Sequence, residues 1–359
     1  MARSRRKPPE VTTTVVKEDF LNTLNSVQSG IATKEAMLQA TSFVFQNGYV
    51  TTFNDDIAMT CPIGLSDEFK FAVDAGTLLN FLKKVKNKKL ELSLSGQKLL
   101  INGKFFMTGL VVNKINMPID QLNFTEDRDW FDIPTDLFYY LRMAASVCSK
   151  DKEKKIFMHV HITDECIEAC DNSHIMFCEF KTGLKKNNDA LISAKNVIEL
   201  CKHDGFHKYH VSNSWITFIN HSGLQFACRN VVESFPSLAG ILDKKLTIKP
   251  TTIHLPKELT ESVKRASVFK TEEKHLFGIE LLLADNNIII NAKNDYGFHN
   301  ESIDIDFEGD IGFTINPDYL LYILESTDTL EYHKKSNSIS FDDNDVTHLV
   351  MLKAVKRKK

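Results

Sequence analysis

Apolar and polar positions repeat along this chain with a period near 120 residues. Three segments place an apolar strand residue, a candidate N-cap residue and a first helical turn in that order: Val73-Asp74-Ala75, Ile192-Ser193-Ala194 and Ile315-Asn316-Pro317. Asp, Ser and Asn are favoured at N-caps because their side chains accept hydrogen bonds from the free N–H groups of the first turn. Each segment therefore predicts the start of a helix.

The apolar residues that follow these three starts recur at the same offsets. They are Leu78, Leu79, Phe81 and Leu82 in the first copy, Val197, Ile198, Leu200 and Cys201 in the second, and Leu320, Leu321, Ile323 and Leu324 in the third. This spacing predicts the apolar stripe of one amphipathic helix, present three times. Three unrelated domains with a coincidental period are the alternative, which the matching offsets disfavour.

Each copy also carries strand signals and an earlier helix. Alternating segments after the repeated helix predict strands at 90–94 and 98–101, 208–211 and 215–219, and 329–332 and 338–341. Earlier helices are predicted at 17–31, 135–149 and 257–269, each followed by two strands that meet at a polar turn. Those turns contain Asn54-Asp55-Asp56, Asp171-Asn172-Ser173 and Asn294-Asp295. The pattern predicts an α+β protein of three tandem domains, at 1–124, 125–248 and 249–359, with linkers at 117–130 and 235–245.

Length and composition agree with a folded protein of this size. The chain has 359 residues, of which 43% are hydrophobic and 25% charged, which suits two or three domains. No apolar run reaches the roughly 18 residues that a membrane span needs, and the first ten residues lack the apolar core of a signal peptide. Seven scattered cysteines favour reduced thiols. We therefore expect a cytoplasmic protein without a membrane partner.

The charges are unevenly distributed. The formal net charge is −3, yet lysines concentrate at 83–89, at 150–155 and near both ends, while acidic residues concentrate at 304–310 and 342–345. This pattern predicts one basic and one acidic face, which allows nucleic-acid binding despite the negative total. A solvated charged surface without a ligand is the alternative.

Several ordered segments resemble the bacterial β sliding clamps. Residues 169–175 (ACDNSHI) resemble the A-T-D-G-H-R-L turn of that family, and Val197-Ile198-Glu199-Leu200 falls where the family has a similar helix. Ser234-Phe235-Pro236 resembles its G-R-F-P linker, residues 312–321 (GFTINPDYLL) resemble its I-G-F-N-x-x-Y-L-L helix entry, and His348-Leu349-Val350-Met351 resembles the start of its Y-V-V-M-P-M-R-L ending. The likeness covers residues 12 to 355, and the order and spacing of the motifs carry it.

This resemblance implies a fold, a function and a set of partners. The implied fold is a ring-forming set of DNA-clamp domains, each with two helices packed on antiparallel sheets. The implied function is a processivity factor, not an enzyme, that encircles double-stranded DNA and tethers the replicative DNA polymerase. The implied partners are DNA, the polymerase, a clamp loader and a second copy in a head-to-tail homodimer. Divergence from the bacterial pattern and the Lys/Asn-rich composition favour a phage-encoded clamp, at work in the cytoplasm of a bacterial or virus-infected bacterial cell.

A clamp must hold DNA without stopping on one sequence, so it needs charges that contact phosphates and not base edges. Lysine is a flexible point charge that suits this task. The predicted DNA-binding residues are Lys83, Lys84, Lys86, Arg142, Lys195, Lys202, Lys264 and Arg265. The third copy is acidic at 325–328, where the first copy is basic, which puts its contribution in doubt.

The resemblance also implies two protein interfaces. A partner-peptide groove between the second and third domains would contain Met158, Cys170, Ser173, His174, Ile175, Leu349, Met351 and Val355. Ring closure would bring Val268 and Phe269 of one subunit to Phe105 or Phe106 of the next. Ordinary core packing is the alternative for both sets. Residues 352–355 (LKAV) replace the family's P-M-R-L, so the groove's specificity need not follow the bacterial pattern.

No motif in the chain indicates an enzyme or a cofactor. Cys166, Cys170, His174 and Cys178 fit no paired zinc-ligand spacing, and His203, His207 and His210 flank a glycine after a helix. Phosphate-binding glycine loops and nucleophile elbows do not occur. Asp55-Asp56 is more typical of a hairpin turn than of a nuclease site. Beside the clamp, a non-ring nucleic-acid-binding protein and an enzyme of unknown type stay open.

Overall fold

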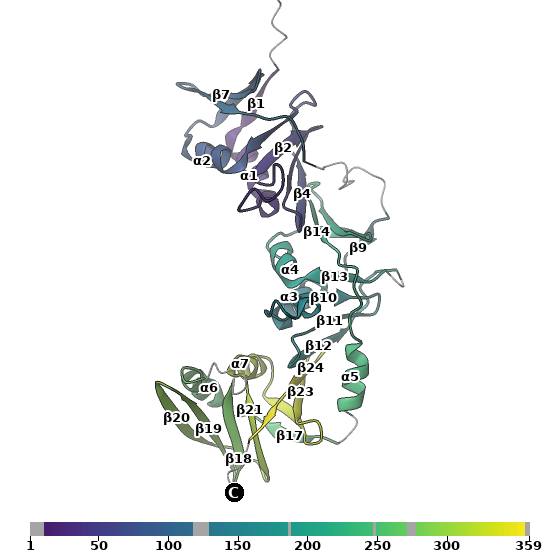
Figure 1. The fold of residues 1–359 in the computed structure, drawn as a ribbon, viewed down its shortest axis with the longest axis vertical. Coiled ribbons are helices and arrows are strands. Elements are labelled where there is room, and N and C mark those ends of the chain that lie inside the picture. Colours follow the sequence, from purple (N-terminus) through teal and green to yellow (C-terminus); the bar gives the residue numbers. More distant parts are fainter. Residues whose placement is uncertain (1–10, 118–128, 186–187, 247–248, 271–277, 356–359) are drawn as a thin grey trace, which may run out of the picture. The chain divides into compact units, whose positions relative to one another are not determined.

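The computed structural model describes residues 11–117, 129–185, 188–246, 249–270 and 278–355 (Figure 1). The chain forms two compact units, which are residues 1–135 with 183–232 and residues 136–182 with 233–359. Helices and antiparallel sheets occur in both units, so the predicted α+β class is confirmed. The predicted domain boundaries at 124 and 248 lie outside the described residues.

Unit 1 contains the first copy of the repeat and part of the second. Its helices are α1 (Lys17–Ser26), the 3-10 turn η1 (Gln28–Gly30), α2 (Ala75–Lys84) and α4 (Ala194–Leu200). Its strands are β1 (Thr12–Val16), β2 (Ser42–Gln46), β3 (Tyr49–Phe53), β4 (Ile57–Pro62), β5 (Phe71–Asp74), β6 (Lys89–Ser95), β7 (Lys98–Asn102), β8 (Met107–Val111), β9 (Phe131–Asp132), β13 (Ala190–Ser193), β14 (Phe206–Val211), β15 (Trp215–Asn220) and β16 (Gln225–Arg229). One sheet has the order β1-β6-β7-β8. The other, β5-β2-β3-β4-β16-β15-β14-β9, joins the two copies where β4 pairs with β16.

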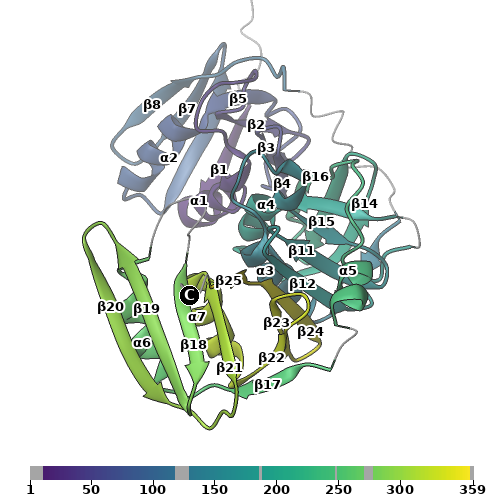
Figure 2. The ribbon, with the colours of Figure 1, turned by 60° about the horizontal axis from the view of Figure 1, so that its bottom comes forward.

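Unit 2 contains the rest of the second copy and the third. Its helices are α3 (Leu137–Val147), the 3-10 turn η3 (Lys155–Met158), α5 (Leu238–Lys245), α6 (Leu259–Ser267) and α7 (Pro317–Ser326). Its strands are β10 (His159–Ile162), β11 (Cys166–Cys170), β12 (His174–Glu179), β17 (Thr251–His254), β18 (Ile279–Ala284), β19 (Asn287–Asn294), β20 (Gly297–Asp304), β21 (Asp310–Ile315), β22 (Thr329–His333), β23 (Ser338–Asp343), β24 (Val346–Met351) and β25 (Lys353–Ala354). Seven strands run in the order β10-β11-β12-β24-β23-β22-β17, and five in the order β20-β19-β18-β21-β25. Helices α6 and α7 pack together on one face of the five-stranded sheet (Figure 2).

The three repeated helices begin at the predicted N-caps. Asp74 Oδ1 accepts a hydrogen bond from the Thr77 N–H at 2.7 Å, and Ser193 Oγ accepts one from the Asn196 N–H at 3.2 Å. Asn316 Oδ1 accepts one from the Asp318 N–H at 3.0 Å. In each case a side chain satisfies a backbone donor that the helix itself leaves free, so the prediction is confirmed for α2, α4 and α7.

Most of the predicted apolar stripe is buried, whereas Phe81, Cys201, Leu321 and Leu324 are half-buried and Ile198 is exposed. Leu78 and Leu82 of α2, Leu200 of α4 and Leu320 of α7 are all at most 1% exposed. Ile198 of α4 is 51% exposed. Helix α4 spans only Ala194–Leu200, and Ile198 lies beside a buried face that Val197 and Leu200 define, so the stripe is narrower in this copy than predicted.

The predicted polar turns join strand pairs in all three copies. Asn54 Oδ1 accepts from the Ile57 N–H, and Asp171 Oδ1 accepts from the His174 N–H, each at 2.8 Å. Asn294 Oδ1 accepts from the Gly297 N–H at 3.1 Å. These Asx turns close the hairpins β3–β4, β11–β12 and β19–β20.

The predicted linker at 235–245 is wrong in its second part, because Leu238–Lys245 form helix α5. Ser237 Oγ caps this helix by accepting from the Gly240 N–H at 3.3 Å. Leu238 and Leu242, four residues apart, are buried against the sheet of unit 2. Packing of this pair outweighs the low helix propensity of Gly240. The predicted linker at 117–130 lies largely outside the described residues. In the described ranges, no helix is both long and apolar enough to span a membrane.

Candidate DNA-binding and partner-binding surfaces

The first candidate DNA-binding surface is the α2 lysine cluster, which we define as Lys83, Lys84 and Lys86. Lys83 and Lys84 lie in the last turn of α2, and all three side chains are exposed. The buried residues of α2, among them Leu79 and Leu82, fix the orientation of the helix and leave the lysines on its solvent side. Among the described residues, no carboxylate lies within ion-pair distance of the three lysines. Their charges are available to an external anion.

The candidate cations of the second copy are more dispersed. Lys195 lies in the first turn of α4 and is exposed. Lys202 Nζ lies 2.5 Å from Glu199 Oε1, so its charge is paired within the same segment. Arg142 is exposed on α3, in unit 2. Lys195 and Lys202 thus belong to unit 1, whereas Arg142 belongs to unit 2.

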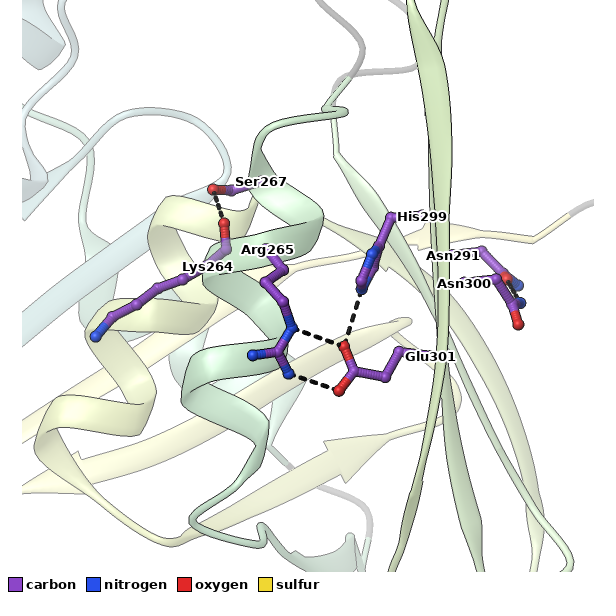
Figure 3. Close-up of polar contacts among 7 residues, drawn as sticks. All are labelled: Lys264, Arg265, Ser267, Asn291, His299, Asn300 and Glu301. Atoms are coloured by element: carbon purple, nitrogen blue, oxygen red, sulfur yellow. Dashed lines mark hydrogen bonds and ion pairs between the residues drawn. The ribbon is translucent and has the colours of Figure 1, made fainter.

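The candidate cations of the third copy are held in ion pairs on α6 and β20 (Figure 3). Arg265 donates from Nη2 to Glu301 Oε1 at 2.6 Å and from Nε to Glu301 Oε2 at 3.1 Å. His299 Nε2 lies 3.0 Å from Glu301 Oε2. The Arg265 hydrogen bonds are the main reason that the pKa of Glu301 is lowered to about 2, so this carboxylate keeps its charge. Lys264 Nζ lies 2.8 Å from Glu261 Oε1, one helical turn away.

Three of the predicted groove residues meet on one face of the sheet that contains β11, β12 and β24. Cys170, Ile175 and Leu349 are direct cross-strand neighbours on β11, β12 and β24, and none is more than 8% exposed. Leu238 and Leu242 of α5 pack on them. We call these five residues the α5 cluster. Burial raises the pKa of the Cys170 thiol to about 11, which keeps it protonated and apolar.

The other predicted groove residues lie around this cluster or away from it. His174 projects to the opposite face, because neighbouring strand residues alternate between faces; it is buried against Tyr319 and Tyr322 of α7. The Met351 N–H donates to Ser173 O at 2.7 Å, which brings these two together. Met158 ends η3 and is half-buried. Val355 lies beside Gly312 of β21.

The predicted dimer residues divide into exposed and packed side chains. Phe105 is 87% exposed beside β8, an edge strand of unit 1, and Val268 is 70% exposed at the end of α6. Phe106 instead packs edge-on against Phe81, with ring centroids 5.7 Å apart. Phe269 stacks on His299 near β20, an edge strand of unit 2. Each edge therefore combines an anchored aromatic ring with an exposed apolar side chain.

Sequence reasoning missed further apolar residues at both edges. Met107 of β8 is 70% exposed, Phe298 of β20 is 74% exposed, and Tyr296 precedes it in the turn before β20. Residues 297–304 are mostly polar, and Phe298 and Ile303 are the only large apolar residues among them. The sequence pattern does not reveal that this strand lies at the edge of its sheet.

In the described ranges, no group of three or more His, Cys, Asp or Glu side chains could hold a metal ion. No disulfide joins any of the seven cysteines. Cys170 belongs to the α5 cluster, and Cys148, Cys178 and Cys228 are buried.

No protein-family model matches the chain, and no curated protein matches it in sequence. Solved structures do match. The Pseudomonas aeruginosa DnaN sliding clamp (DNA polymerase III subunit beta), bound to griselimycin, is 16% identical with a TM-score of 0.78; the match covers 97% of this chain and 100% of that one. The DNA polymerase III beta chain from Streptococcus pneumoniae gives 17% identity, a TM-score of 0.79, and coverage of 96% and 100%. The DNA polymerase III beta subunit from Thermotoga maritima is 16% identical with a TM-score of 0.75, and the match covers 97% of this chain and 100% of that one. The chain thus has the fold of the bacterial β sliding clamps over essentially its whole length.

Proposed function

We propose that this protein is a DNA sliding clamp, a non-enzymatic processivity factor that encircles double-stranded DNA and tethers the replicative polymerase. The observation that carries the proposal is a fold that extends over the full length of bacterial proteins described as sliding clamps or as beta subunits of DNA polymerase III. A shared fold alone does not fix a function, so the surfaces of this chain supply the rest of the argument.

We assign DNA binding to exposed cations that contact phosphates and do not recognise bases. Exposed lysines such as Lys83 and Lys195 can follow phosphates on flexible side chains, whereas base recognition requires bidentate donors in a groove. Such binding releases counterions, so it weakens steeply as salt rises. A topological ring retains DNA even when each such contact is brief.

Ring closure is assigned to the two edge strands. β8 and β20 each leave backbone N–H and C=O groups free for another strand, and each carries exposed apolar side chains, including Phe105 and Phe298. Edge strands of this kind are prone to pair with another chain unless they are protected. Pairing of β8 of one subunit with β20 of the next makes a head-to-tail contact, which closes a ring when the rotation permits it. A homodimer supplies six copies of the repeat.

Partner binding is assigned to the surface around the α5 cluster. Cys170, Ile175 and Leu349 form an apolar floor under α5, with Met351 on the same face as Leu349. An apolar side chain of a polymerase or clamp-loader segment would dock beside α5, as peptides do in hydrophobic grooves. The protein would do this work in the cytoplasm of a bacterial or virus-infected bacterial cell.

The proposal is tested by topology. The purified protein is loaded by mass action on nicked circular duplex DNA in moderate salt, and retention is measured before and after the circle is linearised. Release on linearisation is expected, because a ring slides off a free end. Equal retention on both forms, or no retention on either, contradicts the ring and favours a non-ring nucleic-acid-binding protein.

A further inference from the structure

We infer that the phosphate contacts of this clamp are concentrated on the α2 lysine cluster of the first copy, and that the cations of α6 in the third copy are neutralised by carboxylates of their own domain and do not contact DNA. The inference rests on the proposed function and deepens it. It revises the predicted DNA-binding set, which gave Lys264 and Arg265 the same role as Lys83 and Lys84.

Arg265 forms an ion pair with a carboxylate of its own domain, that of Glu301. Both of its hydrogen bonds to Glu301 use the planar fork of the guanidinium group, at 2.6 and 3.1 Å. This bidentate arrangement is among the strongest pairings available to a side chain. His299 contacts the same carboxylate from a neighbouring position on β20. A phosphate that approaches Arg265 would therefore meet an ion pair without a net positive charge.

Lys264 is also paired with a carboxylate, which lies on its own helix. Its Nζ lies 2.8 Å from Glu261 Oε1, on the same exposed side of α6. Helix α7 adds carboxylates and no cation, because its sequence contains Asp318 and Glu325 but neither Lys nor Arg. Lys270, which follows α6, lies 3.4 Å from Asp318. The two helices of the third copy therefore display paired cations and additional acidic groups.

The first copy has the opposite arrangement. Lys83, Lys84 and Lys86 are exposed, with Lys88 and Lys89 exposed just beyond them. No described carboxylate forms an ion pair with these lysines. Lysines in a last helical turn also offset the partial negative charge of the helix end, but Lys86 and the residues after it lie outside α2. The α2 lysine cluster therefore keeps a positive charge that carboxylates neutralise on α6.

Three matched double variants test the inference, each removing two positive charges. They are Lys83→Gln with Lys84→Gln, Lys264→Gln with Arg265→Gln, and Lys334→Gln with Lys335→Gln, the last pair being exposed in the turn between β22 and β23. Binding to nicked circular DNA is measured over a range of salt concentrations. The α2 variant is expected to lose affinity and to lower the salt slope by up to about 0.9 for each lost contact. The other two are expected to keep the native salt slope, because neither removes a phosphate contact. A lowered salt slope in the folded α6 variant overturns the inference.

A gain-of-binding variant tests the role of the carboxylates directly. Glu261→Gln with Glu301→Gln keeps the cations of α6 and removes the charges that neutralise them. Several-fold tighter DNA binding is expected, and Glu261→Gln alone, on an exposed helix face, gives a smaller gain if the double variant does not fold. Unchanged affinity in folded variants contradicts the neutralisation argument. Release of the native protein on linearisation is scored separately, so that failure of the ring mechanism is distinguished from failure of this inference.

Discussion

His174 Nε2 lies 3.0 Å from His348 Nδ1, on the face of the β12–β24 pair that α7 covers. Tyr322 of α7 extends the network, with its hydroxyl 3.4 Å from His348 Nε2, and the Tyr319 hydroxyl bonds to Asp171 in the β11–β12 turn. β12 belongs to the second copy of the repeat and β24 to the third. These side chains thus tie α7 to the sheet that joins the two copies.

The first prediction follows from the protonation of this pair. Burial lowers the pKa of both His174 and His348 to about 3, so both rings are neutral in the folded protein near pH 7. In the unfolded chain they titrate near 6.5. The two neutral rings contribute fully to the free energy of unfolding above about pH 6.5. This contribution is lost as the pH falls toward 3, because the unfolded chain then binds protons that the folded protein does not bind. We expect the free energy of unfolding to fall between pH 7 and 5, by at most about 1.4 kcal/mol per pH unit for each histidine.

His348→Gln checks this attribution, because glutamine keeps hydrogen-bonding groups but does not titrate. The pH slope of the free energy of unfolding, measured by chemical denaturation, is expected to become shallower by roughly one proton. His254→Gln, at an exposed position of β17, serves as the matched control for the loss of one histidine side chain. The same slope in all three proteins would count against the histidine pair.

The second prediction concerns the caps of the repeated helices. Asp74→Ala removes the acceptor of the Thr77 N–H at the start of α2, and loss of an N-cap side chain costs about 1 kcal/mol. The free energy of unfolding is expected to fall by that amount, measured by denaturant titration. Asp67→Ala, at an exposed loop position, is the control for loss of one carboxylate. A cost no greater than that of Asp67→Ala would show that the cap contributes little.

The helix caps and polar turns were predicted correctly because they depend on residues that are close together in the sequence. Asp74, Ser193 and Asn316 bond to backbone groups two or three residues away, so all the information needed lies in a few neighbouring positions. The predicted strands and the repeat follow from the same local periodicity. These parts of the fold were predictable for that reason.

Features that depend on distant partners were not predictable. Arg265 resembles a free cation in the sequence, yet its partner Glu301 is 36 residues away on another element. The contact between His174 and His348 spans 174 positions. Helix α5 depends on an apolar surface that β11, β12 and β24 build together. In each case tertiary packing decided the role of a residue whose local pattern was ambiguous.

The third prediction uses Cys170 as a reporter of the α5 cluster. The thiol is 3% exposed and has a raised pKa, so slow reaction with an alkylating reagent is expected in the native protein. Leu242→Ala removes a side chain that packs on the cluster, which should cost about 2 to 5 kcal/mol. Alkylation at Cys170, followed by mass spectrometry, is expected to become faster.

Ile241→Ala is the matched control, because Ile241 is only partly buried on the same helix. It is expected to change the reactivity of Cys170 less than Leu242→Ala does. Equal acceleration by both substitutions would indicate that α5 detaches as a whole and that Leu242 has no specific role in covering the thiol.

The fourth prediction concerns the two edge strands. Phe298→Glu places a charge on an exposed position of β20, and Phe105→Glu does the same beside β8. If these edges pair between subunits, either carboxylate must be buried without a partner at the interface, which is strongly unfavourable. Each variant is expected to shift the protein toward the monomer in sedimentation analysis, while its unfolding transition stays close to that of the native protein.

Val232→Glu is the control for the edge prediction, since Val232 is 80% exposed but lies after β16, on neither edge strand. It adds the same charge and removes a comparable exposed apolar side chain. The assembly state should therefore match that of the native protein. A shift caused by all three substitutions would reflect net charge, whereas a shift confined to Phe105→Glu and Phe298→Glu would locate the contact at β8 and β20. Because the contact is head-to-tail, a mixture of the two edge variants retains one native β8 and one native β20 facing each other, so it should form a dimer joined at only one of its two interfaces.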